Sequence, residues 1–281
     1  MEIDWQGVED YTNSVGKRPK LIMHYLNFDP FNLLLLKPIV KEIAAKPYDY
    51  YAQIGLDFYS YPKKGKYNDR KDISRDISIH GYDMVLENLA IFFKEIEIPV
   101  FLRLGYEFGG NGFGYKYNPQ DYVSAWQHIV TYFREAKVNN VAFVWNNLDE
   151  MNYMSFYPGD EYVDWWAINI FDLTPERKNQ IINFVVDADR HRKPVMIAES
   201  TPREIGTANG IQAYSLWFKP YFDLIDNYPQ IKAFCYLNAS WADFPDKSFS
   251  QDCRLQANAR LAQQYRVWLS QKKFINAAPN D

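Results

Sequence analysis

Short apolar runs recur along this chain, and segments with helical periodicity separate them. We predict strands at residues 3–6, 20–25, 50–57, 99–105, 141–146, 163–171, 193–199 and 231–237. We predict helices at residues 8–15, 30–45, 82–96, 118–133, 174–190, 209–228 and 255–269, and a long polar loop at residues 61–78. Apolar strands that alternate with helices are typical of parallel sheets. Eight such strands predict an α/β fold, a (β/α)8 TIM barrel, with residues 1–281 as a single domain.

The strand predicted at residues 99–105 ends close to a carboxylate. Arg103 is the one charged residue inside it, and Glu107 follows its end, just before a glycine-rich run. Parallel α/β folds place their chemistry at the carboxyl ends of strands. We therefore predict that Glu107 is catalytic. The alternative is a surface glutamate just past its strand.

The strand predicted at residues 193–199 ends in a second glutamate, Glu199. Glycoside hydrolysis needs two carboxyl groups, a protonated acid for the leaving oxygen and an ionised carboxylate for the anomeric carbon. Two glutamates at the tips of two buried strands match this requirement. The pair indicates a glycoside hydrolase more strongly than either residue alone.

The composition is compatible with a carbohydrate partner. Aromatic residues make up 17% of the chain, with 22 Tyr and 8 Trp. Sugar rings stack their C–H faces on aromatic rings, although aromatic core packing explains the same excess. The net charge of −4 argues against a nucleic-acid partner, because nucleic-acid modules usually carry a clustered basic face.

Motifs for other kinds of site are missing from the sequence. The four histidines, His24, His80, His128 and His191, lie far apart in the chain without the spacing of metal ligands, so we predict no metal site. The Gly-x-Ser-x-Gly elbow of serine hydrolases is absent as well. We expect no cofactor.

The cysteine count and the hydropathy pattern bound the protein class. Cys235 and Cys253 are too few for a disulfide framework, although one bridge stays open. The longest aliphatic run, residues 33–36, is far too short to cross a bilayer, so we expect no membrane span. We expect a secreted or periplasmic protein whose leader is absent from this sequence, with a cytoplasmic location as the alternative.

Four motifs together resemble a known family. They are Arg-Leu-Gly-Tyr-Glu at residues 103–107, Val-Trp-Asn at 144–146, the Tyr-Pro-Gly-Asp block at 157–165 and Val-Met-Ile-Ala-Glu at 195–199. In this order they resemble glycoside hydrolase family 26 of clan A, which includes many β-mannanases. The resemblance implies retaining β-glycosidases on (β/α)8 barrels, with the acid/base after the fourth strand and the nucleophile after the seventh. Glu107 matches the acid/base and Glu199 the nucleophile, and our strand count places both on those strands.

The resemblance and the strand ends suggest roles for further residues. We expect Arg103 to keep the nucleophile ionised, with a structural buried ion pair as the alternative. The candidate sugar-stacking rings at strand ends are Trp145, Trp241 and Tyr25, each equally compatible with the core. Asn146 and Asn238 are candidate partners of sugar hydroxyls, or ordinary turn residues. His24 is a candidate for the cleft lining, or a core histidine.

Two positions depart from the mannanase pattern. Tyr106 stands where the family usually has histidine, and Phe171 stands where it commonly has a tyrosine that reaches the nucleophile. Both would lie beside the sugar next to the scissile bond, so we predict a β-linked polysaccharide or oligosaccharide substrate that need not be mannan. Another β-glycan or a bacterial exopolysaccharide fits as well. The alternatives are a catalytically silent glycan-binding barrel and a barrel enzyme with unrelated chemistry.

Overall fold

The computed structural model of the protein describes residues 3–28, 30–62, 70–96, 98–109, 116–148, 150–242 and 250–279. These residues form two compact units. Unit 1 consists mainly of residues 21–167, and unit 2 of residues 4–20 and those from 168 onward. The single-domain assignment stays a prediction.

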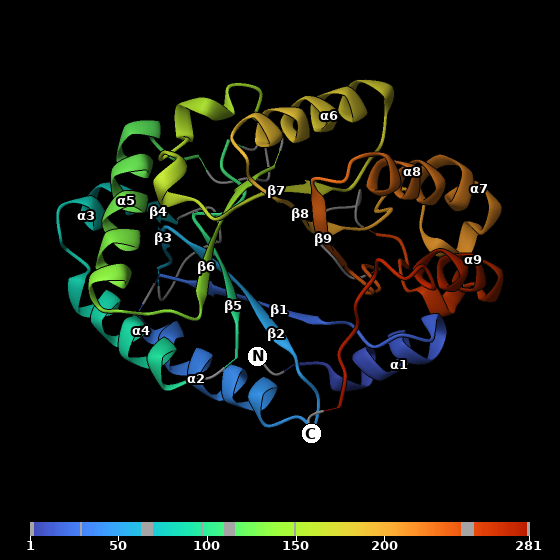
Figure 1. Ribbon diagram of the computed structural model, residues 1–281, viewed down its shortest axis with the longest axis horizontal. Helices are drawn as coiled ribbons and strands as arrows, with labels where there is room; N and C mark the ends of the chain where they lie inside the picture. Colours follow the sequence, from blue (N-terminus) through green and yellow to red (C-terminus); the bar gives the residue numbers. More distant parts are fainter. Residues whose placement is uncertain are drawn as a thin grey trace. The chain divides into compact units, whose positions relative to one another are not determined.

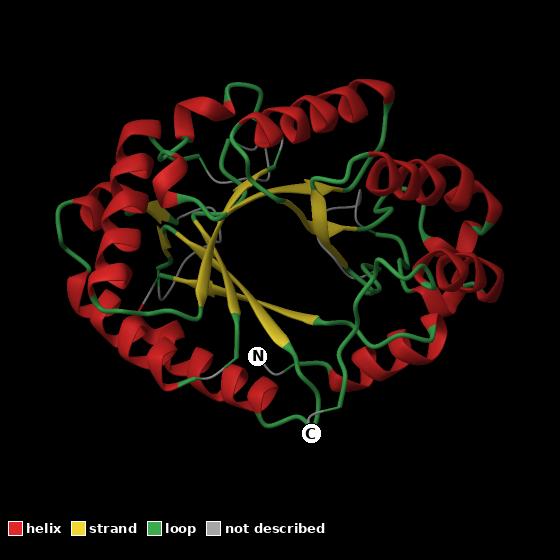
Figure 2. Cartoon of the chain, viewed as in Figure 1, coloured by secondary structure: helices red, strands yellow, loops and turns green. Residues whose placement is uncertain are grey.

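Seven strands make up the main sheet: β1 (Leu21–Asn27), β2 (Tyr51–Asp57), β5 (Val100–Leu104), β6 (Val141–Asn147), β7 (Trp165–Ile170), β8 (Val195–Ser200) and β9 (Ile231–Tyr236). Their order in the sheet is the order of the chain, and the pairs β1–β2, β2–β5, β5–β6 and β8–β9 are parallel. Figure 1 labels the strands, and Figure 2 shows them in yellow. Strand β7 begins in unit 1 and ends in unit 2. Seven of the eight predicted strands are therefore confirmed.

The strand predicted at residues 3–6 was wrong. Helix α1 (Trp5–Val15) begins there, with Asp4 as its N-cap. The Asp4 Oδ1 atom accepts a hydrogen bond from the Gly7 backbone N at 2.9 Å. Aspartate is among the favoured N-cap residues, because its side chain satisfies an amide of the first helical turn. This local bond stabilises a helix here, whereas the short and weakly apolar segment offers little to stabilise a strand.

In unit 1 the helices α2 (Pro30–Ala44), α4 (Asp83–Glu95) and α5 (Pro119–Glu135) lie on one face of strands β1, β2, β5 and β6 (Figure 1). Asn118 is the N-cap of helix α5, and its Oδ1 accepts bonds from Gln120 N at 3.0 Å and Asp121 N at 3.1 Å. The predicted loop at residues 61–78 was wrong in part, within the residues described. Strand β4 (Lys71–Asp72) pairs with β3 (Tyr59–Ser60), and helix α3 (Ser74–Ser78) follows. The 3-10 turns η2 (Tyr153–Phe156) and η3 (Asp160–Tyr162) complete this unit.

Unit 2 contains α1, α6 (Pro175–Arg190), α7 (Ile211–Ala213), a π-helical segment η5 (Tyr214–Phe218), α8 (Lys219–Asn227) and α9 (Ala259–Leu269). The 3-10 turns η4 (Thr207–Asn209) and η7 (Leu255–Ala257) precede α7 and α9. The prediction of one uninterrupted helix at residues 209–228 was therefore wrong, because the region consists of a 3-10 turn, two α-helices and a π-helical segment. Pro220 has no backbone N–H and cannot continue the ordinary helical ladder, which accounts for wider turns just before it.

Aromatic packing fills the core of unit 2. The rings of Trp217 and Tyr221 stack with centroids 4.6 Å apart, and those of Phe222 and Trp268 stack at 4.1 Å. Helix α1 is joined to α9 by Arg266, whose Nη2 donates to the Asn13 and Ser14 carbonyls at 2.9 Å each. Much of the aromatic excess noted in the sequence therefore belongs to the core, where such pairs add about 0.5–1.5 kcal/mol beyond area burial.

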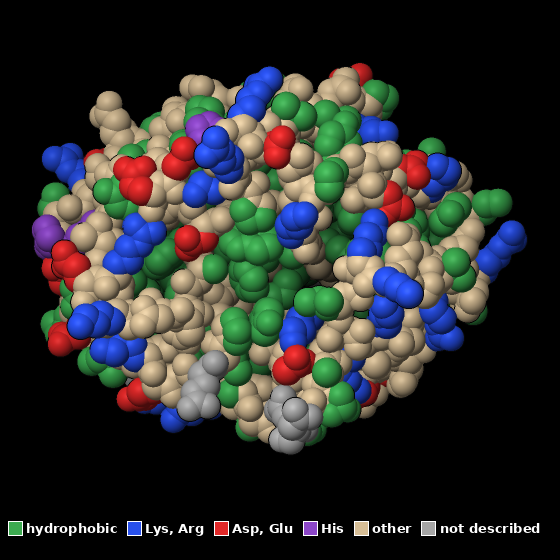
Figure 3. Space-filling view, viewed as in Figure 1, with side chains coloured by type: hydrophobic (Ala, Val, Ile, Leu, Met, Phe, Trp, Pro, Cys, Tyr) green, Lys and Arg blue, Asp and Glu red, His purple; other side chains and the backbone are tan. Residues whose placement is uncertain are grey.

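The surface carries charges of both signs. Figure 3 shows acidic and basic side chains interspersed over the face in view, in keeping with the small net charge of −4. Among the helices of the described residues, none is both long and apolar enough to span a membrane.

Candidate active site

The turn after β5 holds Glu107 in an unusual backbone conformation. Gly105 has a φ of 47° and Glu107 a φ of 55°, both in the left-handed region. A Cβ atom on Gly105 would lie 2.6 Å from Cε2 of Tyr122 and 2.9 Å from the Phe58 ring. A side chain is therefore excluded at residue 105. For a non-glycine residue such as Glu107 the conformation costs about 1–2 kcal/mol, and strain of this kind clusters at functional sites.

Arg103 is fully buried on β5 and bonded to the neighbouring strand. Its Nη2 and Nε atoms donate to Asn146 Oδ1 on β6, at 2.5 and 3.2 Å. The side chain of Asn146, which is also fully buried, donates in turn to the Asn147 carbonyl at 3.1 Å. A buried guanidinium needs such acceptors, because an unpaired buried charge is very costly. The structure thus brings together two of the residues that the sequence singled out.

Two tyrosines lie against the Arg103 guanidinium. Its Cζ atom is 4.8 Å from the ring centroid of Tyr106 and 5.9 Å from that of Tyr25. The two rings are themselves 5.7 Å apart, and a Cβ on Gly55 would come within 3.0 Å of Tyr25 and 3.1 Å of Tyr106. Gly55 thus leaves room for both rings. Tyr25 is 39% exposed, whereas Tyr106 is buried, so Tyr25 is the ring of this pair that offers a face to a ligand.

Gln53 and Met23, which the sequence did not single out as site residues, lie beside this group. Gln53 on β2 is fully buried, and its Nε2 donates to the Met23 sulfur at 3.1 Å. Arg103 Nη1 donates to the same sulfur at 3.6 Å. A glutamine inside an otherwise apolar strand was the available signal, because buried polar side chains require partners.

Trp145 and His24 lie on the face of the sheet opposite to that of Arg103 and Asn146. Successive residues of a strand point to opposite faces. His24 therefore shares a face of β1 with the buried Ile22 and Leu26, and burial lowers its pKa. Trp145 precedes Asn146 on β6, is fully buried, and donates from Nε1 to the Phe156 carbonyl at 3.1 Å.

Trp145 thus belongs to the core of unit 1. Its ring stacks on Phe108 with centroids 4.9 Å apart, and it meets Trp166 edge-on at 4.8 Å. A sugar cannot reach a ring with no exposed surface. The prediction of a stacking platform at Trp145 was wrong. His24 is half-buried, and its place in the cleft lining stays a prediction.

In unit 2, Glu199 lies in a β-bulge near the end of β8. Partner residues advance from Ile197 to Ser200 on β8 while they advance only from Phe234 to Tyr236 on β9, so β8 holds one extra residue. Bulges re-aim side chains and are enriched next to active sites. Glu199 is only 6% exposed.

The residue after Glu199 anchors this end of β8. The Ser200 hydroxyl lies 2.9 Å from the Tyr221 hydroxyl on α8 and donates to the Cys235 carbonyl at 2.7 Å. The Leu237 backbone N donates to the Ser200 carbonyl at 2.9 Å. These bonds hold the strand end, and with it the backbone of Glu199, at a defined position.

The other predicted residues of unit 2 lie near strand ends. Phe171, directly after β7, is half-buried with the Arg203 Cζ atom 5.6 Å from its ring centroid. Trp241 is half-buried, and its backbone N donates to the Gln251 carbonyl at 3.1 Å. Sugar contacts at Phe171 and Trp241 stay predictions.

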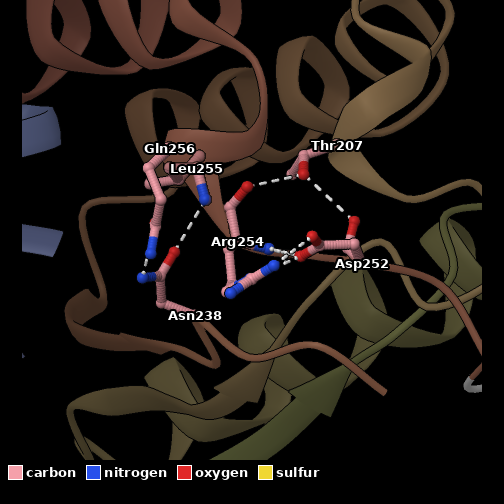
Figure 4. A network of polar contacts seen from close by, with 6 residues as sticks. All are labelled: Thr207, Asn238, Asp252, Arg254, Leu255 and Gln256. Atoms are coloured by element: carbon pink, nitrogen blue, oxygen red, sulfur yellow. Dashed lines mark hydrogen bonds and ion pairs between the residues drawn. The ribbon is translucent and has the colours of Figure 1, made fainter. Parts of the chain in front are cut away.

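Asn238 holds a turn in the chain after β9. Its Nδ2 donates to Gln256 Oε1 at 3.0 Å, and its Oδ1 accepts from Leu255 N at 2.7 Å. Figure 4 shows these bonds next to the pair formed by Arg254 and Asp252, which are 2.7 Å apart, and to Thr207. The amide of Asn238 thus has a structural role, and its contact with a sugar stays a prediction.

The remaining cysteines and histidines bear on two further predictions. Cys235 and Cys253 are both thiols, so the one possible bridge is absent. His80 and His128 are far apart in the chain, yet their ring centroids are 4.2 Å apart. Distance along the chain does not limit contacts between side chains on different elements, and the absence of a metal site stays a prediction.

Comparison with known proteins identifies the family. The sequence profile of glycosyl hydrolase family 26 matches residues 66–248, about two thirds of the 281 residues. The chain belongs to glycosyl hydrolase family 26. The resemblance read from the four motifs is thereby confirmed.

Named relatives of this family-26 chain include two β-1,3-xylanases. The one from Vibrio sp. is 27% identical over 227 residues, 69% of this chain and 48% of that protein. The one from Alcaligenes sp. is 28% identical over 228 residues, again 69% and 48%. The chain thus spans about half the length of these curated relatives.

Solved structures of the family show the same fold. A β-mannanase of family 26 from Bacteroides ovatus has a TM-score of 0.69 at 16% identity, covering 95% of this chain and 83% of that one. GH26C from Muricauda sp. has a TM-score of 0.68 at 19% identity, covering 95% and 81%. The predicted α/β fold, a (β/α)8 TIM barrel, is confirmed.

The strands that carry the two glutamates have other positions in the strand order than predicted. With the strand at residues 3–6 replaced by a helix, Glu107 follows the third strand of the described sheet and Glu199 lies on the sixth. The interval of three strands between them is the one that the resemblance implied. Only the absolute count was shifted.

Proposed function

We propose that the protein is an endo-acting, retaining β-glycosidase that hydrolyses a β-linked polysaccharide, with Glu107 as acid/base and Glu199 as nucleophile. Membership of family 26 supports the reaction class. The observation that carries the residue assignment is that both glutamates stand near the carboxyl ends of parallel strands, where the backbone departs from regular geometry. Such ends are where (β/α)8 enzymes place their catalytic groups.

The chemistry follows from the two carboxyl groups. In a retaining mechanism Glu199 attacks the anomeric carbon while Glu107 protonates the departing oxygen, and Glu107 then deprotonates the water that hydrolyses the glycosyl-enzyme. The attack requires an ionised nucleophile. We infer that Arg103, a buried cation four residues before Glu107, supplies positive potential that favours the ionised form and the developing negative charge.

The relatives guide the choice of substrate. The two β-1,3-xylanases are matched over 69% of this chain, whereas a mannan endo-1,4-β-mannosidase is matched over 56%. Tyr106 and Phe171 replace residues that the mannanase pattern carries. We therefore propose β-1,3-xylan as the first substrate to test, followed by β-mannan, mixed-linkage glucan and bacterial exopolysaccharides.

Replacement of either glutamate tests the assignment. We expect Glu107→Gln and Glu199→Gln each to lower the rate of polysaccharide hydrolysis by at least about 1,000-fold, because each removes a group that acts in the transition state. Release of reducing ends from the panel of glycans measures this rate. Glu176→Gln, in the exposed first turn of α6, is the matched control and should keep wild-type activity.

An activated aryl glycoside separates the two roles. A good leaving group needs no protonation, so Glu107→Ala should still form the glycosyl-enzyme in a burst, whereas Glu199→Ala should not. Mass spectrometry of the protein after incubation detects the covalent sugar. Glycan binding by a wild-type protein that neither hydrolyses nor becomes labelled would favour the catalytically silent barrel instead.

A further inference from the structure

Three side chains from two separate parts of unit 1 converge at its surface. His80 Nδ1 lies 3.0 Å from Asp83 Oδ2, and His128 Nε2 lies 2.6 Å from Asp83 Oδ1. The candidate ligand atoms of the three residues all lie within 4.8 Å of one another. In Figure 3, histidine side chains lie beside acidic ones at the left edge of the view, where Figure 1 labels α3, α4 and α5.

We propose that His80, Asp83 and His128 form a zinc-binding site that joins the α3–α4 connection to helix α5. Two imidazole nitrogens and one carboxylate oxygen are a donor set that Zn²⁺ accepts in proteins, with water completing the coordination. Zn²⁺ would take the place of the two protons that bridge Asp83 to the imidazoles. The proposal is independent of the glycosidase assignment, because it uses none of the same residues.

The backbone at His80 supports a role for its side chain. His80 follows α3 with a φ of 69°, in the left-handed region where glycine or asparagine usually ends a helix. Its backbone N donates to the Ile77 carbonyl at 3.1 Å, and Gly81 N donates to the Asp76 carbonyl at 2.9 Å. Positive φ is uncommon for residues other than glycine, although histidine adopts it more often than most, and such positions are a reason to look for function.

The other two ligands are held by regular helices. Asp83 is the first residue of α4, where the helix dipole favours a negative charge. His128 lies in α5 and is 45 residues from Asp83 in the chain. The two oxygens of the Asp83 carboxylate thus each face one imidazole nitrogen.

The exposure of the three side chains suits a site that an ion can enter. The His128 side chain is only 15% exposed, whereas those of Asp83 and His80 are 39% and 66% exposed. His128 and Asp83 are the less exposed ligands and are held in place, whereas the exposed His80 ring can adjust to the geometry of the ion. Because bound zinc would join the segment that holds His80 and Asp83 to helix α5, 45 residues away in the chain, its binding should stabilise the folded state.

Calorimetric titration with zinc chloride tests the proposal on the whole chain. We expect one ion per chain for the wild-type protein, and at least about tenfold weaker binding for His80→Gln and His128→Gln, since each loses a ligand. His191→Gln removes a histidine at the end of α6 and is the matched control. It should bind zinc as the wild type does.

A second measurement guards against a variant that fails to fold. Zinc should raise the melting temperature of the wild type and of His191→Gln, with reversal by a chelator, and should leave that of His80→Gln unchanged. His80 is the most exposed ligand, so His80→Gln should fold normally by circular dichroism. Equal zinc affinity in His80→Gln and the wild type, or no binding by the wild type, would overturn the proposal.

Discussion

At the scale of single residues, the turn before Glu107 depends on Gly105. The backbone of Gly105 is left-handed, a conformation that disfavours any residue with a Cβ atom. A Cβ at this position would also meet two aromatic rings. We expect Gly105→Ala to lower the free energy of unfolding by about 2–5 kcal/mol, the sum of the conformational and overpacking costs. Urea denaturation measures the change.

Gly16 provides the matched control for that substitution. It also has a positive φ, 72°, but a Cβ there would lie 3.4 Å from the flexible Arg266 side chain and meet nothing closer. Gly16→Ala should therefore cost only about 1–2 kcal/mol, the conformational part. Equal losses for the two variants would contradict the steric argument at Gly105.

Arg103 is the residue whose chemistry a lysine cannot reproduce. Its Nε and Nη2 share one acceptor on Asn146, an arrangement that a single ammonium group does not match. We expect Arg103→Lys to lower kcat by at least about 100-fold, with a much smaller change in KM, as for a group that stabilises the transition state. Steady-state kinetics on the substrate polysaccharide measures both constants.

Arg134→Lys is the control for Arg103→Lys, because Arg134 lies exposed on α5. It should leave kcat and KM unchanged. If Arg103→Lys raised KM alone, the residue would bind substrate and transition state equally, and the role proposed for it would be wrong.

At the scale of elements, the starts of helices α5 and α6 could be predicted well. Asn118 and Thr174 each precede a proline, and the structure makes both of them N-caps. Asn118 accepts two backbone bonds. We expect Asn118→Ala to lower the free energy of unfolding by about 1 kcal/mol and Asn118→Asp to cost much less. Thermal or urea denaturation checks this, and equal losses in the two variants would argue against the cap.

Seven strands were predictable because each follows a mostly apolar run, and the residues of β2, β5, β7 and β8 are nearly all buried. The failures lie where local signals compete. At residues 3–6 an N-cap aspartate favours a helix, and at residues 71–72 two polar residues pair as a strand with no apolar signal. Before Pro220 a helix that looked regular in sequence contains a π-helical segment.

At the scale of the whole molecule, the burial of His24 predicts how stability depends on pH. Burial lowers the pKa of His24 in the folded state, whereas an unfolded histidine titrates near 6.5. As the pH falls below about 6.5 the unfolded chain binds the proton first, so the free energy of unfolding falls until the folded pKa is passed. Above about 6.5 both states are neutral and this contribution is constant.

His24→Gln should reduce this loss of stability between pH 7.5 and pH 5. Urea denaturation across that range measures it, and His191→Gln is the control that should keep the wild-type slope. An unchanged slope in His24→Gln would mean that the burial of His24 does not shift its pKa in solution.

The candidate site was only partly predictable. Glu107 and Glu199 stand near the ends of apolar strands, a property of the sequence alone, whereas the left-handed turn and the bulge that hold them are properties of the fold. Trp145 and Asn146 are neighbours in sequence, yet one packs in the core and the other binds Arg103. Which face of a strand a residue occupies is set by the register of the sheet.

The amino-acid sequence by itself determined the class of fold, the alternation of strands and helices, and the two carboxylates near strand ends. The reason is that the periodicity of apolar residues and the helix-capping residues act locally. The tertiary structure alone decided which polar side chains meet. His80 and His128 illustrate this, since they lie on separate elements and only the packing of α5 beside the α3–α4 connection brings them to one carboxylate. Contacts between distant segments depend on the packing of whole elements, and no spacing in the chain encodes them.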